Sequence, residues 1–359
     1  MKIMIPYFTR NNIKISDPVV IGGIERFAQL IYQNFDEVVP VHFTDEDRKK
    51  RRVTSLIAAA VEAHNPDVII VNYDNDPVTV RLQEAVNVPI LWISHTGAGG
   101  ISKIGHVESM QKFLSNNGTL AMVSEHQWQG MDKLSRRVTG KVLDLNGGYI
   151  NSAFSKGDEV VLEAEYDAVT VGRTDKTKNP FWLHKKTEGT GLHTLVLTSY
   201  VSELLYGEHK EYYEANKHWE HPQEVIRGLS HSDTMKKMAE AGCYVSTCPV
   251  ETWGITALEA LAHGLPTVLV TNSTETHASE CIPAINKDIV KVRTTVKSED
   301  LKEIIKNLRK ISYQERVEIS ERTKEKHSVE AWKTSILNSI DKTIENYKMN
   351  SNNLTDFFA

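Results

Sequence analysis

Two glutamates in one short stretch are the residues whose type and spacing most clearly suggest chemistry. Glu251 and Glu259 both lie in "CPVETWGITALEALAHGLPTVLV", residues 248–270. Apolar residues recur with helical spacing after Gly254, and Gly264 fits the left-handed position just past a helix end. The stretch therefore predicts a strand, a loop that carries one glutamate, a helix that carries the other, and a second strand.

The start of that helix is a candidate anion site. Its first backbone amides, at roughly Gly254 to Ala257, have no partner inside the helix and point outward, which favours a phosphate. Glu251 precedes this positive end, and Glu259 lies about a turn and a half into the helix. Two carboxylates beside a phosphate site suit a ligand such as a nucleotide sugar. Alternatively, Glu251 only favours the helix N-terminus and Glu259 is a solvated surface residue.

The elements that must position these residues follow a regular alternation. Short β-branched runs alternate with helical patterns through most of the chain, which predicts parallel strands joined by crossover helices and hence an α/β fold. The alternation dissolves in residues 151–167 and restarts at "AVTVGR". We expect strands at residues 2–7, 37–43, 67–73, 88–94, 120–124, 142–145, 193–199, 224–229, 243–247, 267–271 and 288–292, and helices at 24–35, 53–64, 107–116, 127–137, 234–241, 255–263, 299–308 and throughout 313–347.

The break at residues 151–167 is the candidate boundary between two Rossmann-like, doubly wound domains. We expect residues 1–155 to form the first domain, joined by the C-terminal helix at about 335–359, and residues 156–334 to form the second. Two such domains facing each other would bind ligands in the crevice at the carboxyl ends of their strands.

Composition limits the class of protein. The chain has 359 residues, 40% of them apolar and 25% charged, which is typical of a globular protein of two domains. It shows neither a signal peptide nor an apolar run long enough to cross a bilayer, so we expect a cytoplasmic protein. Three cysteines without CxxC spacing favour neither disulfides nor a zinc site. The net charge of −5 weighs against nucleic acid, so a nucleic-acid contact would need a local basic groove.

One motif resembles a known family. "ETWGITALEALAHGLPTV" resembles the Glu-x7-Glu signature of retaining GT-B glycosyltransferases of the family 4 type, with Trp253 for the usual Phe and Thr252 for the usual Gly. The resemblance implies a GT-B fold with a nucleotide-sugar donor site in the second domain. The donor-site residues of that motif are Glu251, Trp253, Gly254, Ile255, Thr256 and Glu259.

Other segments resemble further landmarks of the same family. "IGGIERF" resembles its Gly-Gly loop, where Gly22 and Gly23 let the backbone approach a ligand closely, although a simple turn before a helix has the same pattern. "VGRTDKTKNP" resembles its G-R-x-x-x-x-K segment, so Arg173 and Lys178 would hold the donor diphosphate. "SHSDTMKKMAEAG" resembles the stretch beside the nucleotide base, which places His231 there.

The resemblance also implies a mechanism. Arg173, Lys178 and the helix amides would stabilise the departing diphosphate, which is the main electrostatic task of a retaining transfer. Glu251 would bind sugar hydroxyls and stabilise positive charge at the ring, and Glu259 would hold the ribose. His95, at the end of a candidate strand, would orient a sugar hydroxyl or the acceptor. The implied co-substrate is a UDP-sugar, hexose or pentose, with no metal and no other cofactor.

The acceptor is less well defined by the sequence. "TMKKMAEAGCYVS" and "NPDVIIVNYDND" resemble segments of the phage enzyme that attaches α-glucose to 5-hydroxymethylcytosine in DNA, which implies a DNA acceptor and a protein of the host cytoplasm. We expect a monomer. Thr96 stands where the phage enzyme has Asp. A saccharide or lipid-linked glycan acceptor, a GT-B nucleotide-sugar epimerase and a non-catalytic binding module are the alternatives. The expected acceptor-side loop is glycine-rich and contains Thr96, Gly97, Gly99 and Gly100.

Overall fold

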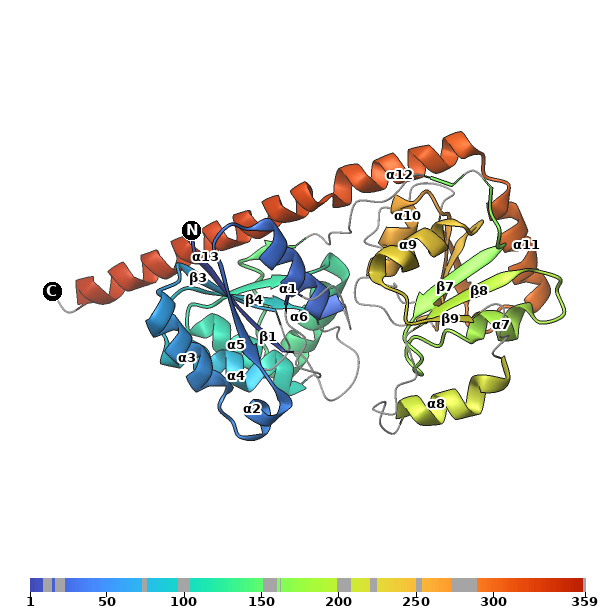
Figure 1. Cartoon of the computed structure of the whole chain (residues 1–359). Helices are drawn as coiled ribbons and strands as arrows, with labels where there is room; N and C mark the ends of the chain where they lie inside the picture. The colour runs from blue at the N-terminus through green and yellow to red at the C-terminus, as the bar shows by residue number, and fades with distance from the viewer. Residues whose placement is uncertain are drawn as a thin grey trace. The chain divides into compact units, whose positions relative to one another are not determined.

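The computed structural model of the chain divides into two compact units (Figure 1). Met1–Ser152 and Glu330–Ala359 form one, here called the N-terminal unit, and Ala153–Val329 form the other, the C-terminal unit. The structure describes residues 1–8, 15–16, 23–72, 76–95, 104–150, 160–161, 163–198, 208–219, 225–249, 254–272 and 289–357.

The N-terminal unit is built on six parallel strands in the order β2-β1-β3-β4-β5-β6. Helices lie on both sides of this sheet (Figure 1), and for that reason β3 and β4 consist almost wholly of buried apolar residues. The chain passes from β1 to β2 on one side and then to β3 on the other, which makes a topological switch point beside β1. The strands are β1 (Ile3–Phe8), β2 (Val38–Phe43), β3 (Val68–Val71), β4 (Ile90–Ser94), β5 (Thr119–Met122) and β6 (Gly148–Tyr149).

Small polar residues and glycine set the ends of helices in this unit. The Thr44 side chain caps α2 in a capping box with Asp47. Ser124 accepts a hydrogen bond from an amide at the start of α6, and Gly140 ends α6 with φ of 70°. The helices are α1 (Gly23–Asn34), α2 (Asp45–Lys49), α3 (Val53–His64), α4 (Asp76–Ala85), α5 (Ile104–Ser115), α6 (Glu125–Thr139) and α13 (Val329–Phe357).

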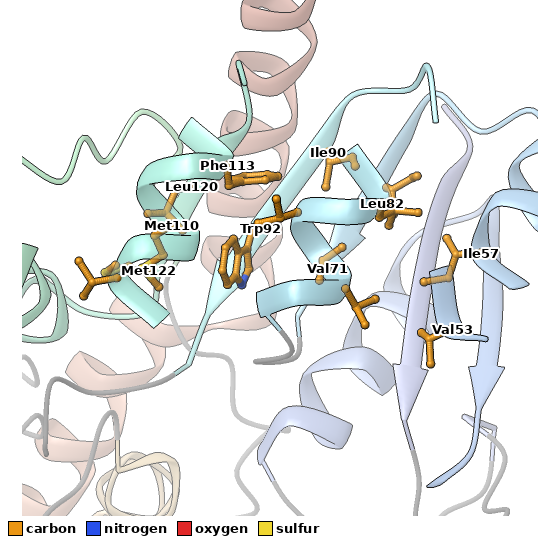
Figure 2. Close-up of a cluster of buried hydrophobic side chains, with 14 of the residues drawn as sticks. Val53, Ile57, Val71, Leu82, Ile90, Trp92, Met110, Phe113, Leu120 and Met122 are labelled. Carbon is orange, nitrogen blue, oxygen red and sulfur yellow. The ribbon is translucent and has the colours of Figure 1, made fainter. Parts of the chain in front are cut away.

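Trp92 lies in the hydrophobic core between the sheet and its helices (Figure 2). The side chain is fully buried, and its ring meets the Phe113 and His106 rings edge-on at centroid distances of 5.4 and 5.6 Å. Burial of an aromatic ring among such neighbours contributes more than its area alone. The packing fixes β4, the strand whose carboxyl end carries His95.

The C-terminal unit repeats the same architecture with the order β12-β11-β10-β7-β8-β9. Here the chain runs from β7 through β8 to β9 on one side and returns to β10 on the other, so the switch point lies between β7 and β10. The strands are β7 (Ala168–Gly172), β8 (Thr194–Thr198), β9 (Val225–Arg227), β10 (Tyr244–Ser246), β11 (Thr267–Thr271) and β12 (Ile289–Arg293). The helices are α7 (Trp182–Thr187), α8 (Glu208–Asn216), the 3-10 turn η2 (Lys217–Trp219), α9 (His231–Ala239), α10 (Ile255–Ala262), α11 (Ser298–Arg309) and α12 (Tyr313–His327).

Helix α12 bonds to the C-terminal end of α10 and to the residues just before β10. The Ser320 hydroxyl donates to the Ala262 carbonyl, and Arg316 Nη2 donates to the Gly242 carbonyl at 2.9 Å. Gly264 follows α10 with φ of 74°, and a Cβ built there would lie 2.5 Å from the Arg316 carbonyl oxygen. Only glycine fits this position without strain, which confirms its predicted place past the helix end.

Helix α13 belongs to the N-terminal unit by its contacts. Trp332 is fully buried and packs edge-on against Phe27 and Phe35, with ring centroids 5.7 and 6.1 Å apart. Farther along, the Ser339 hydroxyl donates to the Gly147 carbonyl at 2.7 Å. Among the helices that the structure describes, none is long and apolar enough to span a membrane.

One expectation about an element was wrong. Residues 142–145 form no strand, because the backbone of Leu143 bonds to side chains of α6: its amide donates to Asp132 and its carbonyl accepts from Trp128. The strand in this region is β6, a few residues later. The helical expectation for residues 313–347 is confirmed, and the helical segment is divided in two because Ser328 adopts extended φ and ψ of −65° and 161° and ends α12.

Candidate functional site

The switch point of the C-terminal unit brings two candidate ligand-binding segments to one sheet edge. Arg173 follows β7 directly, and residues 247–254 lead from β10 into α10. Because β7 and β10 are parallel neighbours, their carboxyl ends lie side by side. Ligands of open α/β sheets bind at this kind of edge.

The segment after β7 is a tight turn organised by Asp175. One carboxylate oxygen, Oδ1, accepts a 2.7 Å hydrogen bond from the Lys178 amide, and the other, Oδ2, lies 3.1 Å from Arg173 Nε. The Asp175 amide in turn donates to the Arg173 carbonyl at 2.9 Å. The buried Asp175 carboxylate thus contacts the guanidinium of Arg173 and the backbone of Lys178, the two residues expected to bind the diphosphate.

The end of this turn is fixed by neighbouring elements. Asn179 adopts the left-handed φ of 45°, and its side-chain oxygen accepts a 2.9 Å bond from the Tyr212 hydroxyl. Burial raises the pKa of Tyr212 well above its usual range, so the hydroxyl remains a donor. Thr247, which follows β10, donates from Oγ1 to the Lys178 carbonyl at 2.7 Å. This last bond joins the two segments of the candidate site.

Gly254 begins α10 in a conformation that glycine adopts readily. Its φ and ψ are 71° and 47°, and its carbonyl accepts bonds from the Ala257 and Leu258 amides at 2.9 and 3.2 Å. The expectation that the Ala257 amide points outward without a partner was therefore wrong, since a tight first turn uses it. Ile255 and Thr256 remain the amides of the first turn predicted to meet a phosphate.

Glu259 is buried, not solvated. The residue is 6% exposed, and its neighbours along α10 from Ala257 to Ala262 are buried apolar residues. Its Oε1 lies 2.7 Å from Nε2 of His231, the first residue of α9. A buried carboxylate needs partners, and His231 supplies one. Two residues expected to bind the nucleotide, separated by 28 positions in the sequence, are therefore in direct contact.

In the N-terminal unit, His95 follows β4 on a rigid base. Its ring meets Phe27 edge-on with centroids 5.1 Å apart, and Phe27 in turn packs on Trp332 of α13. The carbonyl of the preceding residue, Ser94, accepts a 3.0 Å bond from Nε2 of buried Gln127. The aromatic packing and this buried polar contact together fix the backbone at the carboxyl end of β4.

Several predicted site residues fall on parts of the chain that the structure does not describe. Gly23 begins α1. Within the described residues, no three His, Cys, Asp or Glu side chains gather into a group that could hold a metal ion, and metal independence stays a prediction. The predicted residues outside the described parts are Gly22, Thr96, Gly97, Gly99, Gly100, Glu251 and Trp253.

Solved structures resemble the chain over nearly its whole length. Sucrose-phosphate synthase from Thermosynechococcus elongatus matches with a TM-score of 0.65 at 12% identity, over 99% of each chain. HepE from Anabaena in complex with UDP-glucose matches with a TM-score of 0.66 at 12% identity, over 95% of this chain and 99% of its own. The fold is GT-B. No protein-family model and no curated protein sequence matches the chain.

A third GT-B structure is the apo form of the lipopolysaccharide outer core galactosyltransferase WaaB. It matches with a TM-score of 0.61 at 13% identity, over 95% of this chain and 99% of its own. Identities this low show a common fold and nothing finer about activity. The structural matches confirm the expectation of two Rossmann-like domains with a long C-terminal helix.

Sequence reasoning missed Asp175 and Thr247 as site residues. Asp175 stands three residues before Lys178, a spacing at which an Asp side chain commonly accepts a backbone amide and closes a turn. That signal was available in "GRTDKTK". No sequence signal marks Thr247, because its bond to Lys178 depends on the pairing of β7 with β10.

Proposed function

We propose that the chain is a retaining glycosyltransferase that transfers a hexose or pentose from a UDP-sugar to an acceptor hydroxyl. The observation that carries the proposal is the bond from Thr247 to Lys178. It joins the cationic turn after β7 to the segment that leads into α10, at the switch point of a GT-B domain. One diphosphate at this edge can meet both the cations and the first amides of α10.

The proposed chemistry is electrostatic. The bond from the anomeric carbon to the diphosphate breaks, and negative charge develops on the leaving group beside Arg173 and Lys178. Glu251 stabilises the positive charge that develops at the sugar ring, and His95 orients a hydroxyl. Charge stabilisation by groups already in place is the largest catalytic effect in many enzymes.

Binding of the nucleotide is assigned to the pair on α9 and α10. Glu259 accepts hydrogen bonds from the ribose hydroxyls, His231 lies toward the base, and Trp253 is assigned to the donor. A carboxylate that is already buried and hydrogen-bonded loses little entropy on binding. The solved structure of HepE contains UDP-glucose, which supports a nucleotide sugar as the co-substrate of this GT-B chain.

The domain roles follow from these assignments. Residues 156–334 hold the donor, and residues 1–155, joined by residues 335–359, hold the acceptor, with Thr96 and the three following glycines on the acceptor side. The reaction requires no metal, so a chelator leaves turnover unchanged. We propose a monomeric cytoplasmic enzyme.

For the acceptor we propose 5-hydroxymethylcytosine in double-stranded DNA. The supporting observation is the basic segment, residues 48–52, which follows β2 and therefore lies toward the carboxyl edge of the N-terminal sheet, the same edge as His95. All five side chains of this segment are exposed. Lys50 and Arg52 pair with acidic neighbours, so Lys49 and Arg51 are the better candidates for phosphate contacts.

The deciding experiment measures nucleotide release from a panel of UDP-hexoses and UDP-pentoses, with hydroxymethylated DNA, unmodified DNA or glycans as acceptors. We expect release that depends on hydroxymethylated DNA, and NMR of the product should show the anomeric configuration of the donor retained. Absence of turnover with every donor, together with unchanged donor binding in Glu251→Gln, would overturn the enzyme assignment.

A saccharide or lipid-linked glycan is the second candidate acceptor, favoured by the likeness to a lipopolysaccharide galactosyltransferase. Turnover with glycans alone would exclude the DNA role. Replacing Lys49 and Arg51 with Gln separates the two in a second way. The KM for DNA should rise about tenfold. The slope of log affinity against log salt concentration should become shallower by about two. Lys297→Gln with Lys306→Gln, on exposed residues of the other unit, serves as the control.

A further inference from the structure

Among the described acidic residues near the site, Asp175 is the one that contacts both Arg173 and Lys178. Its carboxylate is 5% exposed, and it holds the Arg173 guanidinium through one oxygen and the Lys178 backbone through the other. The residue itself lies in the interior of the turn and is not placed to bind a ligand. Its contacts therefore act on the two residues assigned to the diphosphate.

The contact with Arg173 decides where the guanidinium lies. The Arg173 side chain is 52% exposed, and an exposed arginine otherwise samples many rotamers. The ion pair uses Nε, whereas a phosphate is bound through the outer Nη groups in a forked geometry. An ion pair at this distance limits where the guanidinium lies before the anion arrives, which lowers the entropy lost on binding.

Lys178 is fixed through its backbone on both sides. Its amide donates to Asp175 at 2.7 Å, and its carbonyl accepts from Thr247 at 2.7 Å. The turn also lies close against the end of β7, since a Cβ built at Gly172 would be 3.2 Å from the Lys178 Cβ. The position of the Lys178 backbone, from which the side chain extends, is therefore fixed by Asp175 together with the end of the sheet.

We infer that Asp175 is a positioning residue that holds Arg173 and Lys178 ready for the diphosphate of the donor. This inference rests on the proposed function. Asp175 also adds a negative charge near an anion site, so the two effects oppose each other. Its charge is already paired with Arg173, and the fixed geometry outweighs the remaining repulsion.

The test compares the binding of UDP and uridine by titration calorimetry to the full chain. Asp175→Asn keeps an oxygen for the Lys178 amide and removes the ion pair. We expect its UDP affinity to fall about tenfold and its uridine affinity to change by less than about twofold. The readout separates diphosphate positioning from general damage, because uridine lacks the diphosphate.

The same strand provides a matched control. Asp167 lies at the other end of β7, accepts a 2.8 Å bond from the His193 amide and pairs with Arg309, so Asp167→Asn loses the same kind of contacts away from the site. We expect it to leave the ratio of UDP to uridine affinity unchanged. A double-mutant cycle with Arg173→Ala should show that the loss caused by Asp175→Asn shrinks when Arg173 is absent.

Three outcomes overturn the inference. Unchanged or tighter UDP binding by Asp175→Asn would show that charge repulsion outweighs positioning. Equal losses for UDP and uridine would show a purely structural role, and full additivity with Arg173→Ala would show no coupling. If Asp175→Asn does not fold, Asp175→Ser, whose hydroxyl can still accept the amide, replaces it. Failure of the wild type to bind UDP, ADP or GDP would instead overturn the proposed function.

Discussion

Nε2 of His231 lies 2.7 Å from Oε1 of Glu259, and this contact joins the first turn of α9 to the middle of α10. The two side chains are 24% and 8% exposed, so the contact is shielded but reachable from solvent. A carboxylate has two oxygens, and His231 occupies one of them. The pair orientates the carboxylate while leaving it able to accept a ligand hydroxyl.

Glu259→Gln tests the assignment of this residue to the ribose. Loss of a charge-assisted hydrogen bond should weaken UDP and uridine by a similar factor, about tenfold, because both ligands contain the ribose. Titration calorimetry measures both. Glu303→Gln, on an exposed position of α11, should bind both ligands like the wild type. Uridine binding unaffected by Glu259→Gln would contradict the assignment.

Gly264→Ala should destabilise the C-terminal unit by about 2 to 4 kcal/mol. The substituted residue must hold a left-handed φ, and its Cβ would collide with the Arg316 carbonyl oxygen. Gly189 is a matched control, since it has φ of 69° but a Cβ added there would meet nothing within 4 Å. Gly189→Ala should cost about 1 kcal/mol in chemical denaturation, and equal costs at both positions would argue against the collision.

The stability of the chain should depend on pH through His327. Burial, aided by Lys326, lowers the pKa of His327 from 6.5 to about 4, so the unfolded state binds more protons between these values. The stabilisation is present above pH 6.5 and is lost as pH falls toward 4. This group should contribute a loss of about 2 kcal/mol between pH 7 and pH 5. Denaturation of the wild type and of His327→Gln should differ in pH dependence by this amount.

Trp332→Ala should destabilise the N-terminal unit by about 3 to 5 kcal/mol, because it leaves a cavity against Phe27 and Phe35. Tyr313→Ala, at an aromatic residue that is 48% exposed, should cost less than about 0.5 kcal/mol. Chemical denaturation followed by circular dichroism compares them. A small loss for Trp332→Ala would mean that α13 is held by its polar contacts.

Much of the fold could be predicted because burial dictates the residue types of parallel strands. Residues 68–71 are apolar throughout, residues 267–271 have three apolar residues between two threonines, and the sheets bury both runs on both faces. The run at residues 142–145 has a similar composition but forms no strand. Two side chains of α6 bond its backbone, and such tertiary competition is invisible in a local pattern.

The candidate site was predictable only in part, for a physical reason. Arg173, Lys178 and Glu259 were predicted from the resemblance to a known family, and Gly254 was predicted from its place just before a helical pattern. The pairing of His231 with Glu259 depends on how α9 and α10 pack. A spacing in the sequence contains no such information.

Because α12 ends at Ser328, the chain passes there from one unit back to the other. The N-terminal unit is therefore discontinuous in sequence, and the segment that buries Trp332 against Phe27 is synthesised only after the whole C-terminal unit. During translation the C-terminal unit can complete its core first. The N-terminal unit cannot complete its core until α13 has been synthesised. Premature stop codons late in the gene would thus damage the proposed acceptor domain and spare the donor domain.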